Sequence, residues 1–373
     1  ISSFGVSGTN AHVIIEQAPD VDSAATTTAA EPLITTAPVP WVLSGKTDTA
    51  LRAQAGQLRD FLAARGDESV GLGEVGWSLA TGRARFDHRA VVLGASHRDM
   101  LAGLAALADG QDTPNVVRGV RAGSDGRAVF VFPGQGSQWT GMALDLLDTT
   151  PVFREHIEAC ERALAPHTDW RLTDVLRGLP GAASMDRVDV VQPVLFAVMV
   201  SLARLWQAHG VEPSAVIGHS QGEIAAAHIA GALSLDEAAR IAALRSQAIT
   251  RITGKGGMGH VALPHDQVTE RLKAWPGLSV AAVNGPASTV ISGDATALHD
   301  FITTCESDGI HARAIPVDYA SHSTHVEELR DELATLLGDI TPQASTVPFY
   351  STVTGGVLDT RELTTEYWYT NLR

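Results

Sequence analysis

The pentapeptide Gly-His-Ser-Gln-Gly at positions 218–222 constrains the fold more than any other stretch of this chain. It follows an apolar, strand-like run at 214–217 and precedes an Ala-rich helical run at 223–232. A strand, a Gly-x-Ser-x-Gly turn and a helix form a nucleophile elbow, in which the glycines permit a sharp turn and the serine stands exposed above a sheet. The context therefore predicts an α/β unit with Ser220 as a nucleophile. A tight turn with a helix-capping serine is the alternative.

Composition narrows the class of protein. The 373 residues are 45% hydrophobic, which suits a globular chain of two or three domains. No apolar run approaches ~18 residues, so we expect no membrane partner. The isolated Cys160 and Cys305 argue against a zinc site or a disulfide framework and favour a cytoplasmic protein. The net charge of −15 argues against nucleic acid as a partner and means that an anionic substrate needs local cations.

The patterns along the chain predict several segments. Residues 1–17 are Gly/Ser/Asn-rich and then strand-like, and 18–40 form an Ala/Thr/Pro-rich linker. Residues 41–115 predict a small α/β unit without a cluster of reactive side chains. A larger α/β unit extends over 127–373, and its segment 256–316 has the βαββαβ order of a ferredoxin-like subdomain. The first residues show neither an initiator Met nor a signal pattern, so we expect the interior of a longer polypeptide.

A serine hydroxyl needs a base, and fourteen histidines could supply one. His322 is the best placed, because it follows a predicted strand at 311–315 and precedes a helix start at Thr324, and sites in α/β proteins collect at that edge of the sheet. A surface-loop histidine is the alternative. His219 adjoins the serine, but neighbouring side chains diverge on a sharp turn, and we expect His325 to be solvated within the helix. No Asp follows His322 in the manner of a triad, so we expect a Ser–His dyad oriented by a backbone carbonyl.

The helix predicted over 235–252 carries a cation on its apolar side. Arg245 falls in the middle of a stripe whose other members are Ala238, Ile241, Ala248, Ile249 and Ile252. An inward guanidinium needs an anionic partner, because an unpaired buried charge is costly. The partner is either an internal Asp or Glu, or a substrate carboxylate held in a bidentate clamp.

The segment Pro-Gly-Gln-Gly-Ser-Gln at 133–138 follows the first predicted strand of the larger unit. It lacks the Lys and the spacing of a phosphate loop, which disfavours nucleotide binding. Its glycines let a backbone N–H approach a ligand. We assign Gln135 as the second oxyanion donor, opposite the N–H of Gln221; a plain strand-to-helix turn is the alternative.

Together these motifs resemble the acyltransferase domain of modular type I polyketide synthases, which are multifunctional enzymes of antibiotic biosynthesis. The resemblance rests on Gly-Gln-Gly-Ser-Gln-Trp at 134–139, Gly-His-Ser-Gln-Gly-Glu at 218–223, Leu-Arg-Ser-Gln at 244–247 and Tyr-Ala-Ser-His at 319–322. It implies an α/β fold: an α/β-hydrolase-like large subdomain with an inserted ferredoxin-like small subdomain, preceded by a small α/β linker domain.

The resemblance covers nearly the whole chain. Residues 1–17 are similar to the C-terminal tail of the preceding ketosynthase, and 41–115 to the ketosynthase–acyltransferase linker domain. The family continues beyond the last residues of this chain, so we expect a fragment cut at both ends, with the ketosynthase as a partner in the same polypeptide.

The resemblance also implies roles for individual residues. Ser220 is the nucleophile and His322 the general base, Arg245 holds a malonyl-type carboxylate, Gln135 and Gln221 supply the oxyanion N–H groups, and Asn371 matches the position whose backbone carbonyl orients the histidine. The implied reaction is a ping-pong transfer from an acyl-CoA, through an acyl-serine, to the phosphopantetheine thiol of an acyl carrier protein. No metal or bound cofactor is implied.

Four positions bear on the substrate. Gln192, which ends Arg-Val-Asp-Val-Val-Gln at 187–192, and Tyr319 with Ser321 resemble the methylmalonyl-specific type, as does Gln221. Malonyl-specific domains tend to carry His-Ala-Phe-His at 319–322, and the small Ser321 leaves room for an α-methyl group. A methyl group is worth only ~1–3 kcal/mol, so we expect methylmalonyl-CoA with leakage to malonyl-CoA. Ethylmalonyl, a serine thioesterase or hydrolase, and a non-catalytic docking segment are the alternatives.

Overall fold

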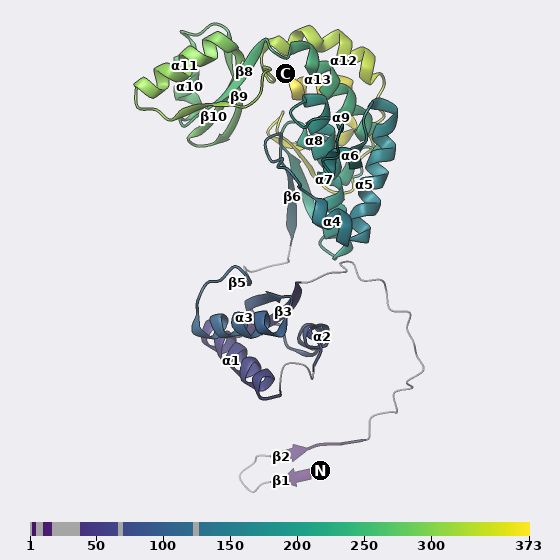
Figure 1. Cartoon of the computed structure of the whole chain (residues 1–373), viewed down its shortest axis with the longest axis vertical. Coiled ribbons are helices and arrows are strands. Elements are labelled where there is room, and N and C mark those ends of the chain that lie inside the picture. The colour runs from purple at the N-terminus through teal and green to yellow at the C-terminus, as the bar shows by residue number, and fades with distance from the viewer. Residues whose placement is uncertain (1, 5–9, 17–37, 66–69, 122–126) are drawn as a thin grey trace. The chain divides into compact units, whose positions relative to one another are not determined.

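The computed structural model describes residues 2–4, 10–16, 38–65, 70–121 and 127–373 (Figure 1). The chain divides by its internal contacts into 1–32 and 33–373. In the first unit, β1 (Ser2–Phe4) pairs antiparallel with β2 (Asn10–His12). Residues 1, 5–9 and 17 of the predicted ketosynthase tail, and nearly all of the linker predicted at 18–40, lie outside the described residues.

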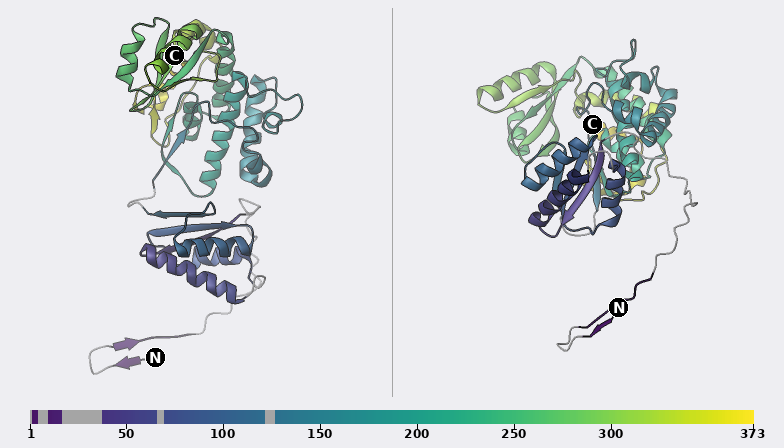
Figure 2. Two further views of the ribbon diagram at one scale, coloured as in Figure 1. Left: turned by 60° about the vertical axis from the view of Figure 1, so that its left-hand side comes forward. Right: turned by 60° about the horizontal axis from the view of Figure 1, so that its bottom comes forward.

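The predicted small α/β unit is a three-stranded antiparallel sheet with three helices. Its elements are β3 (Val39–Gly45), α1 (Asp48–Arg65), α2 (Leu72–Gly82), β4 (His88–Gly94), α3 (His97–Asp109) and β5 (Val116–Val120). Figure 2 shows α1 and α3 side by side against the sheet. The strand β5 was not predicted and extends the sheet past residue 115. It pairs with β4 through Val-Val-Arg-Gly-Val, in which the central Arg and Gly hide the strand pattern.

The larger unit is built on a four-stranded sheet of order β13-β12-β7-β6. Its strands are β6 (Ala128–Phe132), β7 (Pro213–Gly218), β12 (Phe349–Ser351) and β13 (Gly356–Leu358). The pairs β6–β7 and β7–β12 are parallel, and β13 is antiparallel to β12. The C-terminal ends of the parallel strands therefore share one edge, where sites in α/β proteins form.

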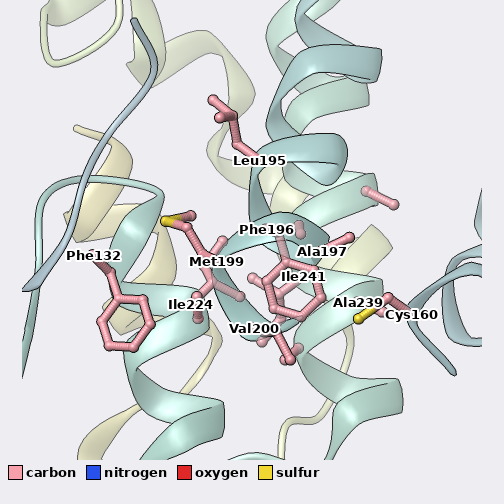
Figure 3. Close-up of a cluster of buried hydrophobic side chains, with 14 of the residues drawn as sticks. Phe132, Cys160, Leu195, Phe196, Ala197, Met199, Val200, Ile224, Ala239 and Ile241 are labelled. Atoms are coloured by element: carbon pink, nitrogen blue, oxygen red, sulfur yellow. The ribbon is translucent and has the colours of Figure 1, made fainter. Parts of the chain in front are cut away.

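Helices enclose the core of this unit. They are α4 (Leu144–Thr149), α5 (Pro151–Leu164), α6 (Leu172–Leu176), α7 (Val188–Ala208), α8 (Gly222–Ile229), α9 (Leu235–Ile249), α12 (Arg330–Leu337) and α13 (Thr365–Leu372). Figure 3 shows side chains from β6, α5, α7, α8 and α9 gathered in one apolar cluster, among them Phe132, Phe196, Ile224 and Ile241. The helix predicted from Thr324 is a 3-10 turn over Thr324–Leu329 that leads into α12.

The helix α7 corrects one expectation from composition. Its 21 residues are long and apolar enough to cross a membrane, with a mean hydropathy of 1.7 in the most apolar window, although no such run was predicted. Inside the fold, 83% of that window is buried. This helix contacts α5, α8 and α9 and is the central helix of the core.

The predicted ferredoxin-like subdomain is confirmed. Its elements are β8 (Gly256–Val261), α10 (His265–Leu272), β9 (Leu278–Gly285), β10 (Ser288–Asp294), α11 (Ala295–Ser307) and β11 (Ala312–Ile315). The strands are antiparallel in the order β11-β8-β10-β9. Because β8 and β11 pair with each other, the subdomain enters and leaves the larger unit through two adjacent strands.

Candidate active site

The elbow predicted around Ser220 is present between β7 and α8. Ser220 has a φ of 53°, a left-handed conformation that non-glycine residues seldom adopt. A Cβ at Gly218 would lie 2.2 Å from the backbone nitrogen of Glu223, and one at Gly222 would lie 2.3 Å from the carbonyl oxygen of Phe132. Both positions therefore require glycine, because the turn brings the strand, the helix and β6 into backbone contact.

Ser220 and His322 form the predicted pair. The serine Oγ lies 2.9 Å from His322 Nε2. His322 also has a positive φ of 61°, and its backbone N–H donates to the carbonyl oxygen of Leu372 at 3.0 Å. This local backbone and the carboxyl end of α13 together aim the imidazole at the serine.

The imidazole of His322 is held in its neutral form. Burial lowers the pKa of His322 to about 3, and the positive charge of Arg245 and the nearby His219 act in the same direction. Hydrogen bonds to the backbone of Leu372 and Asn371 oppose that shift. A neutral Nε2 at physiological pH can accept a proton from the serine hydroxyl.

Arg245 lies inside the unit, as its apolar stripe predicts. Its side chain is 1% exposed, Nη1 donates to Gln192 Oε1 at 3.2 Å and Nη2 donates to Asn371 Oδ1 at 3.0 Å. The buried Nε has no hydrogen-bond partner among the described residues. Burial lowers the pKa of Arg245 to about 10, so the guanidinium stays charged near neutral pH. The site can therefore offer an anion a donor that no other described residue uses.

The alternative of an internal acidic partner for Arg245 is resolved by the same contacts. In the described part of the chain Arg245 forms no ion pair, and its two partners are neutral amides. The negative charge of Glu223 still acts on Arg245, since it raises the pKa of the guanidinium. Glu223 reaches Arg245 through Asn371, to which its carboxylate is bonded.

Of the two predicted oxyanion residues, Gln221 lies within the elbow and Gln135 lies on the loop after β6. Neither Gln135 nor Gln221 donates its backbone N–H to another group within the described residues. The side chain of Gln135 is anchored, because its Oε1 accepts from Tyr319 Oη at 2.6 Å and from Gln192 Nε2 at 3.2 Å. The side chain of Gln221 is 1% exposed, and both of its polar atoms lack a partner among the described residues.

Two of the predicted specificity residues, Tyr319 and Gln192, belong to the same network. Tyr319 and Ser321 are both buried, and burial raises the pKa of the Tyr319 hydroxyl to about 12, so it remains a hydrogen-bond donor. Gln192 lies between Gln135 and Arg245 and bonds to both. Tyr319, Gln135 and Gln192 come from three separate segments, and the fold brings them into one chain of hydrogen bonds that ends at Arg245.

The prediction for His325 is wrong. It was expected to be solvated, but it is half-buried in the 3-10 turn, and its Nδ1 is buried without a partner in the described part of the chain. The tight turn places the imidazole near Gly256, where an added Cβ would lie 3.1 Å from Nδ1. His219 behaves as expected, because its Nε2 is directed to Asn284 Oδ1 at 3.2 Å rather than to the serine.

Sequence reasoning missed one buried acid, Glu223. Its Oε1 accepts from the backbone N–H and the hydroxyl of Thr352 at 2.6 and 2.8 Å, and its Oε2 accepts from Tyr367 Oη at 2.6 Å and Asn371 Nδ2 at 2.9 Å. Burial raises the pKa of Glu223, and these hydrogen bonds oppose the rise. The available signal was a carboxylate directly after the elbow, at the start of a helix whose other side chains are apolar except for His228.

Comparison with family models identifies both folded units. The acyl transferase domain model matches residues 129–373, and the model of the RhiE-like KS-MAT linker domain matches residues 42–111. The whole chain is 54% identical over 386 residues to polyketide synthase GfsE of Streptomyces halstedii. It is 53% identical over 375 residues to the pikromycin polyketide synthase component PikAII of Streptomyces venezuelae. The chain spans 10% of the length of each of these relatives.

Solved structures agree with the family models. The acyltransferase domain from module 8 of the salinomycin polyketide synthase is 51% identical, with a TM-score of 0.88, and the match covers 91% of this chain and 80% of that chain. The acyltransferase domain of SpnD, solved in complex with 2-(pent-4-yn-1-yl)malonyl, is 27% identical with a TM-score of 0.79 over 91% of this chain and 80% of that chain. The chain thus belongs to the acyl transferase domain family, as the acyltransferase domain of a modular type I polyketide synthase together with its ketosynthase–acyltransferase linker domain.

Proposed function

We propose that this acyltransferase loads a methylmalonyl extender unit from CoA onto an acyl carrier protein through an acyl-serine intermediate. One observation carries the proposal: a Ser220–His322 pair at 2.9 Å lies close to a buried cation whose Nε is unpaired within the described residues. The two are linked by Asn371, which donates to the Ser220 carbonyl at 3.2 Å and accepts from Arg245. An acyl group bearing both a thioester and a carboxylate fits such a pair of subsites.

The proposed reaction assigns one task to each group. His322 Nε2 takes the hydroxyl proton as Ser220 Oγ attacks the thioester carbonyl, and the N–H groups of Gln135 and Gln221 bind the oxyanion. The C–S bond breaks, and the proton on His322 passes to the departing CoA thiolate. The phosphopantetheine thiol of the carrier protein then attacks the acyl-serine, with His322 again moving the proton. Arg245 holds the carboxylate throughout, which fixes the acyl group without taking part in bond breaking.

The choice of methylmalonyl over malonyl and ethylmalonyl rests on the wall formed by the 319–322 loop. Tyr319 is fixed by Gln135, and the adjacent Ala320 and Ser321 are small and buried, which favours space for one methyl branch. The carrier protein and the CoA thioester are cytoplasmic reactants, and we propose the same location for this chain. Its two cysteines are both free, which is compatible with that compartment.

An acyl-CoA panel tests the proposed function. The chain is mixed with equimolar methylmalonyl-, malonyl- and ethylmalonyl-CoA, and the acyl-enzyme is read by intact-protein mass spectrometry before and after adding a phosphopantetheinylated carrier protein. We expect the methylmalonyl adduct to dominate and to move to the carrier. A dominant malonyl or ethylmalonyl adduct contradicts the substrate alone. Rapid CoA release with the acyl group going to water supports a hydrolase and contradicts the transfer.

A further inference from the structure

The carboxylate of Glu223 lies three residues after the nucleophile and is fully buried. Its four donors come from Thr352, which supplies two, and from Tyr367 and Asn371. A buried carboxylate is retained only where its hydrogen bonds offset the cost of desolvation. Three of the donors tie Glu223 to the loop after β12 and to α13. The fourth donor, Asn371, connects Glu223 to the active site.

Asn371 carries the effect of this carboxylate to Arg245. An amide offers one donor and one acceptor side, a guanidinium can only donate, and a carboxylate or carbonyl oxygen accepts. The Nδ2 of Asn371 donates to Glu223 and to the Ser220 carbonyl, so its Oδ1 faces Arg245 Nη2 at 3.0 Å. The amide therefore has one orientation, and Glu223 is the charged acceptor on its N–H₂ side.

The orientation of the Asn371 amide fixes the position of the Arg245 guanidinium. Asn371 and Gln192 accept from Nη2 and Nη1, which leaves the buried Nε without a partner among the described residues. A rotated amide would turn its N–H₂ toward the guanidinium, and two donors would then face each other. Arg245 would leave its present position, and the subsite for the carboxylate would be lost.

We propose that Glu223 is a positioning residue for the substrate carboxylate, which it aligns through Asn371 and Arg245 without touching the substrate itself. The inference rests on the proposed function, because it gives Arg245 the carboxylate as its ligand. The carboxylate of Glu223 also adds a negative charge to the site, and this charge partly balances the buried guanidinium of Arg245 when no substrate is bound.

The test compares two substrates that differ only in the carboxylate. Methylmalonyl-CoA and propionyl-CoA share the thioester and the methyl branch, and acyl-enzyme formation is measured for each. With Glu223→Gln we expect the methylmalonyl-to-propionyl ratio of kcat/KM to fall about tenfold, mainly through KM, as a charge-assisted hydrogen bond is replaced by a neutral one. Tyr367→Phe is the matched control, because it removes a donor to the same carboxylate but leaves the Asn371 contact; its ratio should match the native protein.

Two comparisons separate the possible outcomes. If Arg245→Ala does not lower the methylmalonyl-to-propionyl ratio of kcat/KM, the proposed carboxylate clamp is wrong. If Arg245→Ala lowers this ratio but Glu223→Gln does not, only the present inference is overturned. Equal losses for both substrates with Glu223→Gln and a lower Tm also overturn it, because they show a structural role. Should Glu223→Gln fail to fold, Glu223→Asp withdraws the carboxylate from Asn371 by one methylene and must lower the same ratio; an unchanged ratio overturns the proposal.

Discussion

The linker unit and the acyltransferase unit bury different kinds of side chain. Over the described residues 38–65 and 70–121, all buried side chains are apolar, and they form the core around Trp41, Met100 and Leu104. The acyltransferase unit also buries polar groups, including the ions Glu223 and Arg245. Burying an ion costs several kcal/mol unless it is paired or bonded, so a chain keeps one where chemistry needs it. The presence of buried ions therefore distinguishes the unit that holds the candidate active site from the linker unit, without reference to any sequence motif.

The largest expected effect is the loss of acyl loading in Ser220→Ala. The elbow has no other hydroxyl in contact with His322, so no acyl-enzyme should form with any acyl-CoA. Intact-protein mass spectrometry reads the result, with circular dichroism to show that the variant is folded. A methylmalonyl adduct that persists on this variant would locate the nucleophile elsewhere.

Arg245→Ala should show that the buried cation serves the substrate. We expect loading of methylmalonyl-CoA to fall about a hundredfold, since the charged hydrogen bond from Arg245 to the carboxylate is lost, while acetyl- and propionyl-CoA are affected much less. Steady-state rates on the three thioesters, scaled to the folded fraction, give the comparison. A uniform loss would mean that Arg245 only supports the fold.

Exchange of Tyr319-Ala320-Ser321 for His-Ala-Phe should shift the preference toward malonyl-CoA. The Phe ring would fill the space assigned to the α-methyl group, and the malonyl-to-methylmalonyl ratio of kcat/KM should rise by roughly ten- to a hundredfold. Total activity should fall, because the same loop carries His322. Competition between equimolar thioesters measures the ratio; a native preference for malonyl-CoA would refute the specificity proposal but not the transfer.

Leu104→Ala tests the scaffold side of the comparison. Leu104 is fully buried in the core of the linker unit, so its truncation should lower the free energy of unfolding of that unit by about 2–5 kcal/mol. Thermal unfolding measures the loss. Acyl loading well below the melting temperature should match the native rate, and a selective loss for one acyl-CoA would show that this unit also shapes the site.

The smallest expected change is with pH. His322 has a pKa of about 3 rather than about 6.5, so it stays neutral and able to accept a proton as the pH falls from about 8 to about 5. The kcat/KM for loading should therefore be level over that range while the protein remains folded. A fall centred near pH 6.5 would indicate an ordinary, solvated histidine at this position.

Local patterns were enough to predict much of the fold. The βαββαβ order of the inserted subdomain follows from the local pattern of each short segment in turn, and it is present. The strand β5 was missed because Arg118 and Gly119 interrupt its apolar pattern. The sequence did not predict that α7 is long and apolar enough to cross a membrane, because the polar residues Gln192, Ser201 and Arg204 interrupt its apolar run.

Local patterns likewise predicted some features of the candidate active site and not others. The burial of Arg245 followed from the helical period alone, and the strand–turn–helix context predicted the elbow. The partners of Arg245 could not follow from any local pattern, because Gln192 and Asn371 lie 53 and 126 residues away in sequence. Glu223 was read as part of a helical run, since nothing local shows that Thr352 and Tyr367 come to surround it.

The position of Asn371 near the end of α13 sets the order in which this enzyme can mature during synthesis. The elbow and Arg245 leave the ribosome early, but the amide that links them is translated more than a hundred residues later, after the inserted subdomain. Until α13 docks, Glu223 lacks its hydrogen bonds from Tyr367 and Asn371, and Arg245 lacks its hydrogen bond to Asn371. The docking of α13 should therefore be a late step of folding, because Asn371 contacts residues that lie 126 to 151 positions away in sequence.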